Sequence, residues 1–120
     1  MEHNLLCFKR TSTLTALSLP REYREGFYTK SGVWTKLIII KGKMKFVFLD
    51  EQLQSIKELN YNKKTDTGFI EPNSIFRISP TSTDLQFHIE FYCEAQDYFF
   101  NKYDLGTAHP EVVNAMDYLS

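Results

Sequence analysis

The chain has 120 residues, and its 14 Lys and Arg against 15 Asp and Glu give a formal net charge of −1. This length suits a single compact domain, and the near-zero charge argues against a nucleic-acid partner, because neutralising phosphates requires a basic face. Apolar residues make up 42% of the chain, which is too many for a disordered protein. Apolar runs such as residues 37–40 fall far short of the ~20 residues of a membrane helix, and the first residues do not resemble a signal peptide. We therefore expect a cytoplasmic protein with no membrane partner.

The first half of the chain is predicted to consist of short strands and turns. Its expected elements, in chain order, are a strand at residues 4–10, a helical turn at 21–26 with Ser18 or Leu19 near its cap, an extended segment at 27–30, a long strand at 33–41 and a strand at 44–49. The last two are separated only by a tight connection centred on Gly42. Two β-rich runs around a glycine-centred turn are typical of a β-hairpin, so we expect these two strands to pair with each other.

The second half begins with strands and ends with helices. Strands are expected at residues 52–59, 75–79 and 85–92. From Glu94 onward the apolar spacing becomes helical, which predicts a short helix around residues 98–103 and a second helix that starts at His109-Pro110. Several short strands followed by terminal helices favour a small β-barrel or sandwich over a βαβ fold.

The sequence lacks the usual glycine-rich loops that bind nucleotides. Its five glycines, at positions 26, 32, 42, 68 and 106, are too far apart for GxGxxG or GxxxxGK[ST]. The chain therefore cannot hold a nucleotide or S-adenosylmethionine in the usual glycine-rich way. GxSxG and HExxH are absent as well. Cys7 and Cys93 form no CxxC pair, and we expect two buried, reduced thiols.

His88 and Glu90 are a candidate pair for chemistry in the strand-rich part. They are two residues apart on an expected strand, so their side chains project from one face. Such a pair could ligate a metal or share a proton, although a metal site normally takes three or four ligands. The simpler interpretation is a polar pair on the exposed face, with residues 87, 89 and 91 facing the core.

Other candidate pocket residues lie near the expected strand ends. Lys30, Trp34 and Arg77 place cations and an aromatic ring where a small anion could bind in a barrel mouth. The alternative is that Trp34 fills the core and the lysine faces water.

One ordered pattern of residues runs from Leu6 to Tyr92. Its specific part is Tyr28-Thr29-Lys30-Ser31-Gly32-Val33-Trp34-Thr35-Lys36-Leu37, followed by Lys41-Gly42-Lys43-Met44-Lys45-Phe46, Glu71-Pro72 and Phe87-His88-Ile89-Glu90-Phe91-Tyr92. This pattern resembles the TehB/YeaR-like family of cupin-like domains. Residues 97–115 are similar to the segment that follows this domain in the long members, the TehB-type tellurite-resistance methyltransferases.

The resemblance implies an all-β fold, namely a cupin-like double-stranded β-helix (a jelly-roll barrel) with short C-terminal helices. Residues 1–93 would form the barrel, and residues 94–120 a helical connector leading toward a methyltransferase domain that is absent from this chain. It also implies an accessory, non-catalytic N-terminal domain of a parent protein that methylates tellurite. S-adenosylmethionine would then belong to the parent's second domain, and this chain would need no cofactor.

Two other functions remain open. One is a stand-alone small-ligand or oxyanion-binding protein, with tellurite as a possible ligand and Lys30, Arg77, His88 and Glu90 near the pocket. The other is a metal-dependent cupin enzyme. Exposed edge strands also make a homodimer an expectation.

The chain departs from its relatives in two places. Relatives tend to carry His where this chain has Phe27, and a Trp-His pair where it has Ile75-Phe76. The resemblance places those histidines where cupins bind metal, so Phe27 and Phe76 predict an apolar, metal-free interior. The candidate pocket residues are therefore Phe27, Lys30, Trp34, Phe76, Arg77, His88 and Glu90.

Overall fold

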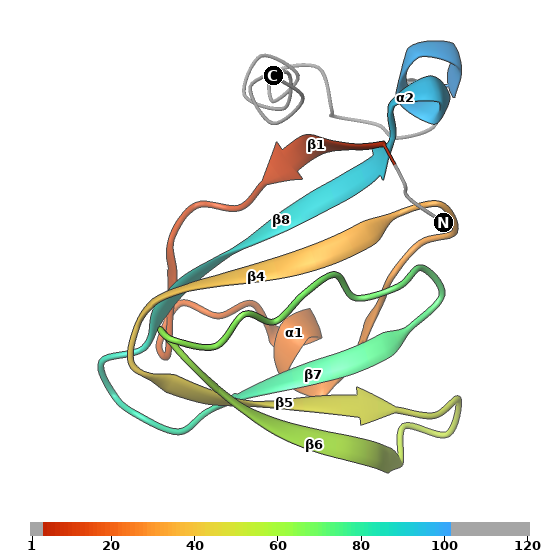
Figure 1. The fold of residues 1–120 in the computed structure, drawn as a ribbon. Helices are drawn as coiled ribbons and strands as arrows, with labels where there is room; N and C mark the ends of the chain where they lie inside the picture. Colours follow the sequence, from red (N-terminus) through yellow and green to blue (C-terminus); the bar gives the residue numbers. More distant parts are fainter. Residues whose placement is uncertain (1–3, 102–120) are drawn as a thin grey trace.

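The computed structural model describes residues 4–101, which are built mostly of antiparallel β-strands with two short helices. The elements are β1 (Leu5–Arg10), β2 (Leu14–Thr15), α1 (Arg21–Glu25), β3 (Phe27–Tyr28), β4 (Trp34–Lys41), β5 (Lys43–Leu49), β6 (Ser55–Asn62), β7 (Ile75–Pro80), β8 (Gln86–Glu94) and α2 (Ala95–Asn101) (Figure 1). The β-rich fold with a short helix after the last strand is confirmed. No helix within residues 4–101 is long and apolar enough to cross a membrane.

The strands form two four-stranded sheets. In the first, which we call the β8 sheet, β4 pairs along one edge of β8, and β1 and β2 share the other edge. The second, the β5 sheet, has the order β3-β7-β5-β6. In Figure 1 the β8 sheet lies above the β5 sheet. Strand pairing within the described residues does not join the two sheets into a closed barrel. The closed barrel that the resemblance implied is therefore not found among these strands.

The predicted hairpin of residues 33–41 and 44–49 is wrong. β4 pairs with β8, whereas β5 pairs with β6 and β7, so the chain crosses from one sheet to the other at Gly42. Gly42 has a φ of +81°, and a Cβ atom there would lie 2.6 Å from the Cα of Leu85 and 2.6 Å from the Oγ of Ser82. Glycine is therefore required at position 42 because the backbone passes close to Leu85 at the crossing, and not because the chain forms a hairpin turn there.

Smaller differences have local causes. β6 runs from Ser55 to Asn62 instead of 52–59, because the carboxylate of Asp50 accepts hydrogen bonds from the backbone N–H groups of Gln52 and Gln54 and holds a turn there. Pro20, and not Ser18 or Leu19, is the N-cap of α1. α2 confirms helix formation after β8, and the second expected helix, at 109–119, lies outside the described residues.

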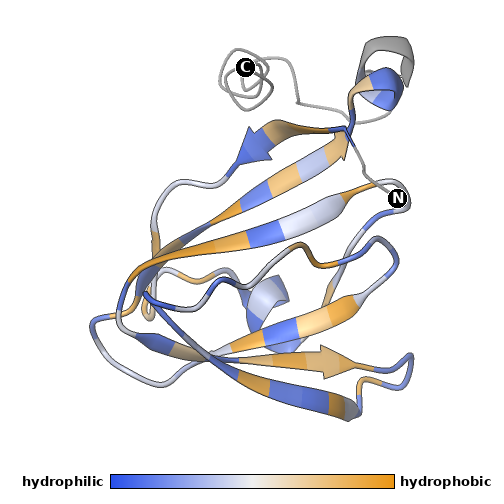
Figure 2. Ribbon diagram, viewed as in Figure 1, coloured by the Kyte–Doolittle hydropathy of each residue, from blue (hydrophilic) through white to orange (hydrophobic). Residues whose placement is uncertain are grey.

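The core lies between the two sheets. Apolar and polar residues alternate along several strands in Figure 2, which is the pattern of sheets with one buried face. On β8, Phe87, Ile89 and Phe91 are buried toward the core, as predicted. The centroids of Phe76 and Phe46 are 4.7 Å apart, and those of Phe76 and Phe27 are 5.4 Å apart. Phe27 and Phe76 thus join an aromatic core.

Candidate functional site

A cavity of about 300 Å³ opens between the β8 sheet and the β3 and α1 end of the β5 sheet. Strands of the β8 sheet contribute Phe8, Thr35 and Phe91, while α1 contributes Tyr23 and β3 contributes Phe27. The remaining lining residues are Lys9, Glu22, Thr29, Lys30 and Val33. Its volume is at the lower end of the roughly 300–1,000 Å³ that is usual for ligand pockets.

Aromatic rings form one part of the cavity wall, and polar side chains form another. Tyr23 stacks on Phe27 with ring centroids 4.6 Å apart, and Phe27 lies 6.1 Å from Phe91. Burial raises the pKa of Tyr23 to about 12, and the nearby carboxylate of Glu22 adds to this shift. The phenol therefore stays protonated at neutral pH and can act as a hydrogen-bond donor.

Two buried threonines differ in how their hydroxyl groups are satisfied. The Oγ1 of Thr29 accepts a hydrogen bond from the backbone N–H of Ser74 at 2.7 Å and lies 3.2 Å from the carbonyl oxygens of Glu71 and Ser74. Thr35 is fully buried, and its backbone exchanges two hydrogen bonds with Ile70. Its hydroxyl, however, has no hydrogen-bond partner among residues 4–101. A buried hydroxyl without a partner costs about 1–3 kcal/mol, so this position is poised to gain from a polar ligand group.

Charged side chains surround the cavity rim. Lys9, Lys30 and Glu22 are exposed and line the opening. None of the three makes an ion pair with another residue in the described range 4–101. The rim therefore carries a net charge of +1, counted as two cations and one anion, that is available to a ligand.

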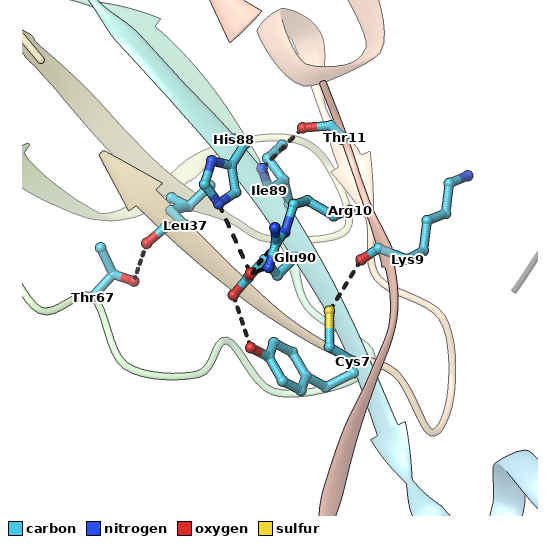
Figure 3. A network of polar contacts seen from close by, with 10 residues as sticks. Cys7, Lys9, Arg10, Thr11, Leu37, Thr67, His88, Ile89 and Glu90 are labelled. Atoms are coloured by element: carbon cyan, nitrogen blue, oxygen red, sulfur yellow. Dashed lines mark hydrogen bonds and ion pairs between the residues drawn. The ribbon is translucent and has the colours of Figure 1, made fainter. Parts of the chain in front are cut away.

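A second group of polar side chains lies on the face of β8 opposite to Phe87, Ile89 and Phe91. We call Arg10, His88, Glu90 and Tyr92 the Glu90 cluster; Figure 3 shows Arg10 and His88 beside the Glu90 carboxylate. Arg10 binds the Oε2 of Glu90 through Nη2 at 2.7 Å and Nε at 3.0 Å. The hydroxyl of Tyr92 donates to Oε1 at 2.8 Å, and the Nε2 of His88 lies 3.8 Å from Oε2.

The expectation of an exposed His88–Glu90 pair is wrong for Glu90, whose side chain is only 3% exposed. Arg10 from β1 and Tyr92 two residues along β8 cover and satisfy the carboxylate, which explains how a charge is tolerated there. Burial lowers the pKa of His88 from its usual 6.5; Glu90 opposes this shift and Arg10 adds to it. Among residues 4–101, no group of three or more His, Cys, Asp and Glu could hold a metal ion.

The structure divides the predicted site residues among several places. Phe27 and Lys30 line the cavity, and Phe76 packs behind Phe27 in the core. His88 and Glu90 lie on the outer face of β8, where Trp34 is opposite Tyr92. Arg77 is in the other sheet, where its guanidinium donates to the Oγ of Ser79 at 2.9 Å. Lys30, Arg77 and the His88–Glu90 pair are therefore not brought together around one pocket.

Several important residues were not singled out from the sequence. Thr35 lies in one row with Leu37 and Ile39 on the buried face of β4. A polar residue in an otherwise apolar row was therefore a usable signal in the sequence. Arg10 and Tyr23 gave no such signal, because they approach Glu90 and Phe27 only through folding.

A model of the TehB-like domain family matches residues 9–89 of this chain, which include most of both sheets. The chain belongs to the TehB-like domain family. It is 35% and 36% identical, over all 120 residues, to the proteins of two Haemophilus influenzae strains named "Probable S-adenosyl-L-methionine-dependent methyltransferase TehB". The chain spans only 42% of the length of these TehB relatives.

Two solved structures are similar to this fold. The crystal structure of TehB from H. influenzae matches the whole chain with a TM-score of 0.81 and 37% identity, and the match covers 42% of that chain. A protein from E. coli strain K12 matches 78% of this chain and 95% of its own, with a TM-score of 0.69. Its identity is 18%, so this second likeness concerns the fold alone.

Proposed function

We propose that this chain is an accessory, non-catalytic domain of an S-adenosylmethionine-dependent tellurite methyltransferase. The observation that carries the proposal is a match along the whole chain to TehB relatives that are named as methyltransferases and of which it spans only 42%. The chain has no glycine-rich loop of the kind that usually holds S-adenosylmethionine. The cofactor site and the methyl transfer then belong to the part of the parent protein outside the matched segment.

The proposal includes a cupin-like arrangement of residues 1–93, with residues 94–120 as a connector. Chain crossings between the sheets, after β4 and again between β7 and β8, support a jelly-roll relationship. Cys7 and Cys93 are buried thiols that form no disulfide within residues 4–101, which fits a reducing compartment such as the cytoplasm. A homodimer is also part of the proposal, because β6 is an edge strand that pairs with β5 and with no other strand of the described residues, and it exposes 66% of Ile56.

A domain exchange with H. influenzae TehB tests the accessory role. Methyl transfer from labelled S-adenosylmethionine to tellurite is measured for the intact relative, for a chimera whose matched segment is replaced by this chain, and for a deletion of that segment. We expect the chimera to keep most of the activity and the deletion to lose it, while the 120-residue chain alone transfers no methyl group. Sedimentation of the 120-residue chain tests the homodimer, which a monomer at high concentration would exclude.

A chimera carrying Gly42→Ala is the matched control, because it keeps the length of the segment and disturbs only its fold. It should behave like the deletion if a folded domain is required. Methyl transfer by the 120-residue chain alone would overturn the non-catalytic role. Equal activity of the chimera and the deletion would overturn the accessory contribution.

The cavity supports a second candidate function, which is binding of a small ligand. It combines aromatic side chains with the hydroxyl of Thr35 and with Lys9 and Lys30 at its rim, and none of these three polar groups has a partner among residues 4–101. A module that binds a ligand need not exclude an accessory role, because the two functions use different parts of the parent protein. Calorimetric titration of the chain with the probes named in the next subsection tests this function separately from methyl transfer.

A further inference from the structure

The cavity has a polar group in its interior, aromatic rings along its wall and charged side chains at its rim. The interior holds the fully buried Thr35, whose hydroxyl can donate one hydrogen bond and accept others but has no partner in the part of the chain that the structure describes. Its neighbour Thr29 uses its own hydroxyl to fix the segment around Ser74, so Thr29 is satisfied by the protein itself. A ligand that reaches Thr35 therefore needs a small polar group at its inner end.

The aromatic part of the cavity wall favours a ring over a bare inorganic anion. Tyr23, Phe27 and Phe91 present aromatic surface to the space in front of Thr35. Moving a small, strongly hydrated oxyanion into such surroundings costs more than its few polar contacts return. An aromatic ring, by contrast, gains from burial and from edge and face contacts with these rings. A volume of about 300 Å³ suits a ligand with a single ring.

The rim favours a negative charge at the outer end of the ligand. Lys9 and Lys30 come from different parts of the chain, yet both border the opening, and neither forms an ion pair with any residue from 4 to 101. Glu22 offsets one of the two charges, which leaves the rim positive by one unit. A carboxylate at the rim can remain partly hydrated, so it keeps much of its solvation while it interacts with the lysines.

We propose that this cavity binds a small aromatic carboxylate with a hydroxyl or carbonyl group on the far side of its ring. The inner polar group meets Thr35, the ring lies among Tyr23, Phe27 and Phe91, and the carboxylate lies at the rim near Lys9 and Lys30. This inference rests on the second candidate function, binding of a small ligand, and adds the chemical class of that ligand. It is independent of whether the parent protein methylates tellurite.

Four probes separate the parts of this inference in calorimetric titrations of the 120-residue chain. They are 4-hydroxybenzoate, benzoate without the inner hydroxyl, phenol without the carboxylate, and tellurite. We expect 4-hydroxybenzoate to bind most tightly, with benzoate and phenol each about tenfold weaker, which corresponds to about 1.4 kcal/mol. Tellurite should not bind in the cavity.

Variants assign each contact. Thr35→Val should weaken 4-hydroxybenzoate about tenfold and leave benzoate unchanged, because only the first ligand reaches the hydroxyl. The double variant Lys9→Gln, Lys30→Gln should weaken both carboxylates and leave phenol unchanged. Lys45→Gln is the matched control, because Lys45 lies in the β5 sheet beside Glu58 and should change no affinity.

The unliganded protein gives a second readout for Thr35. Since valine has the same shape without the hydroxyl, Thr35→Val should raise the melting temperature by a few degrees. A lower melting temperature would show that the hydroxyl already has a partner and would overturn the inference. So would equal effects of Thr35→Val on 4-hydroxybenzoate and benzoate.

The titrations also separate the two levels of the proposal. Binding of tellurite without binding of any aromatic probe would overturn the aromatic class and leave a ligand-binding function standing. Failure of all four probes to bind the folded chain would overturn both.

Discussion

The two faces of the β8 sheet treat buried polar groups in opposite ways. Thr35 pairs with Phe91 across β4 and β8 and points into the cavity, while the next pair, Lys36 and Glu90, points outward. Within the described residues, the hydroxyl of Thr35 has no hydrogen-bond partner, whereas the carboxylate of Glu90 is bound by Arg10 and Tyr92, with His88 nearby. Burial of a polar group therefore does not identify a ligand site by itself; what matters is whether the protein satisfies that group.

The difference has an energetic basis. A charged carboxylate that is buried without partners would cost far more than a neutral hydroxyl, so a stable fold can leave a hydroxyl unsatisfied but not a carboxylate. Glu90 shows the features of a structural group, because short, charge-assisted hydrogen bonds surround it. Thr35 shows the features of a group that is available to a ligand. Three substitutions follow in order of expected effect. The first tests the crossing between the two sheets, and the other two test the Glu90 cluster.

Gly42→Ala should have the largest effect, because the two sheets depend on the crossing between β4 and β5. The added Cβ would lie 2.6 Å from the Cα of Leu85, and the φ of +81° is itself unfavourable for alanine. We expect a loss of about 3 kcal/mol or more in the free energy of unfolding, measured by urea denaturation. Gly32→Ala is the control: its φ is +77° but nothing lies within 4 Å of the new atom, so it should lose only about 1 kcal/mol. Equal losses would contradict the close approach at Gly42.

Arg10→Met should have an intermediate effect, because it leaves the buried Glu90 carboxylate without its cation. The side chain of Arg10 is itself 36% exposed, so the expected loss at pH 7 is about 2 kcal/mol and not the full value for a completely buried pair. Arg21→Met removes the exposed Arg21–Glu25 pair and should leave the free energy of unfolding almost unchanged. If urea denaturation gives similar losses for both variants, the Glu90 cluster is not the satisfied structural group described above.

His88→Gln should have the smallest effect, and only at acidic pH. The fold lowers the pKa of His88 from 6.5, so the native state disfavours the charged imidazole. Well above pH 6.5 the side chain is neutral in both states; as the pH falls through 6.5, the unfolded chain takes up the proton first and the native state loses stability. The free energy of unfolding should therefore fall less between pH 7.5 and pH 5 in the variant. A steeper fall in the variant would mean that Glu90, rather than burial, controls His88.

Local patterns predicted much of the fold but not its strand pairing. The alternation of Phe87, Ile89 and Phe91 correctly gave the buried face of β8, because side-chain direction in a strand follows from sequence alone. The glycine at position 42 suggested a hairpin, since a turn and a crossing between sheets both need a residue with positive φ. Only the position of Leu85, more than forty residues away in the chain, distinguishes them.

The candidate site was predictable only in pieces. Phe27 and Lys30 were identified and do line the cavity, but Arg77, His88 and Glu90 were grouped with Lys30 although they lie on other faces. One sequence gives the residue types and their spacing along a strand, and it does not say which sheet a strand joins.

The sequence by itself determined that this is a β-rich member of the TehB-like family, because family patterns and strand periodicity are local properties of the chain. The tertiary structure decided which polar groups are satisfied. Arg10 reaches Glu90 from 80 residues away, and Thr35 faces aromatic rings from α1, β1, β3 and β8. Hydrogen bonding and desolvation depend on neighbours in space, so only the folded chain separates the structural Glu90 from the unpartnered Thr35.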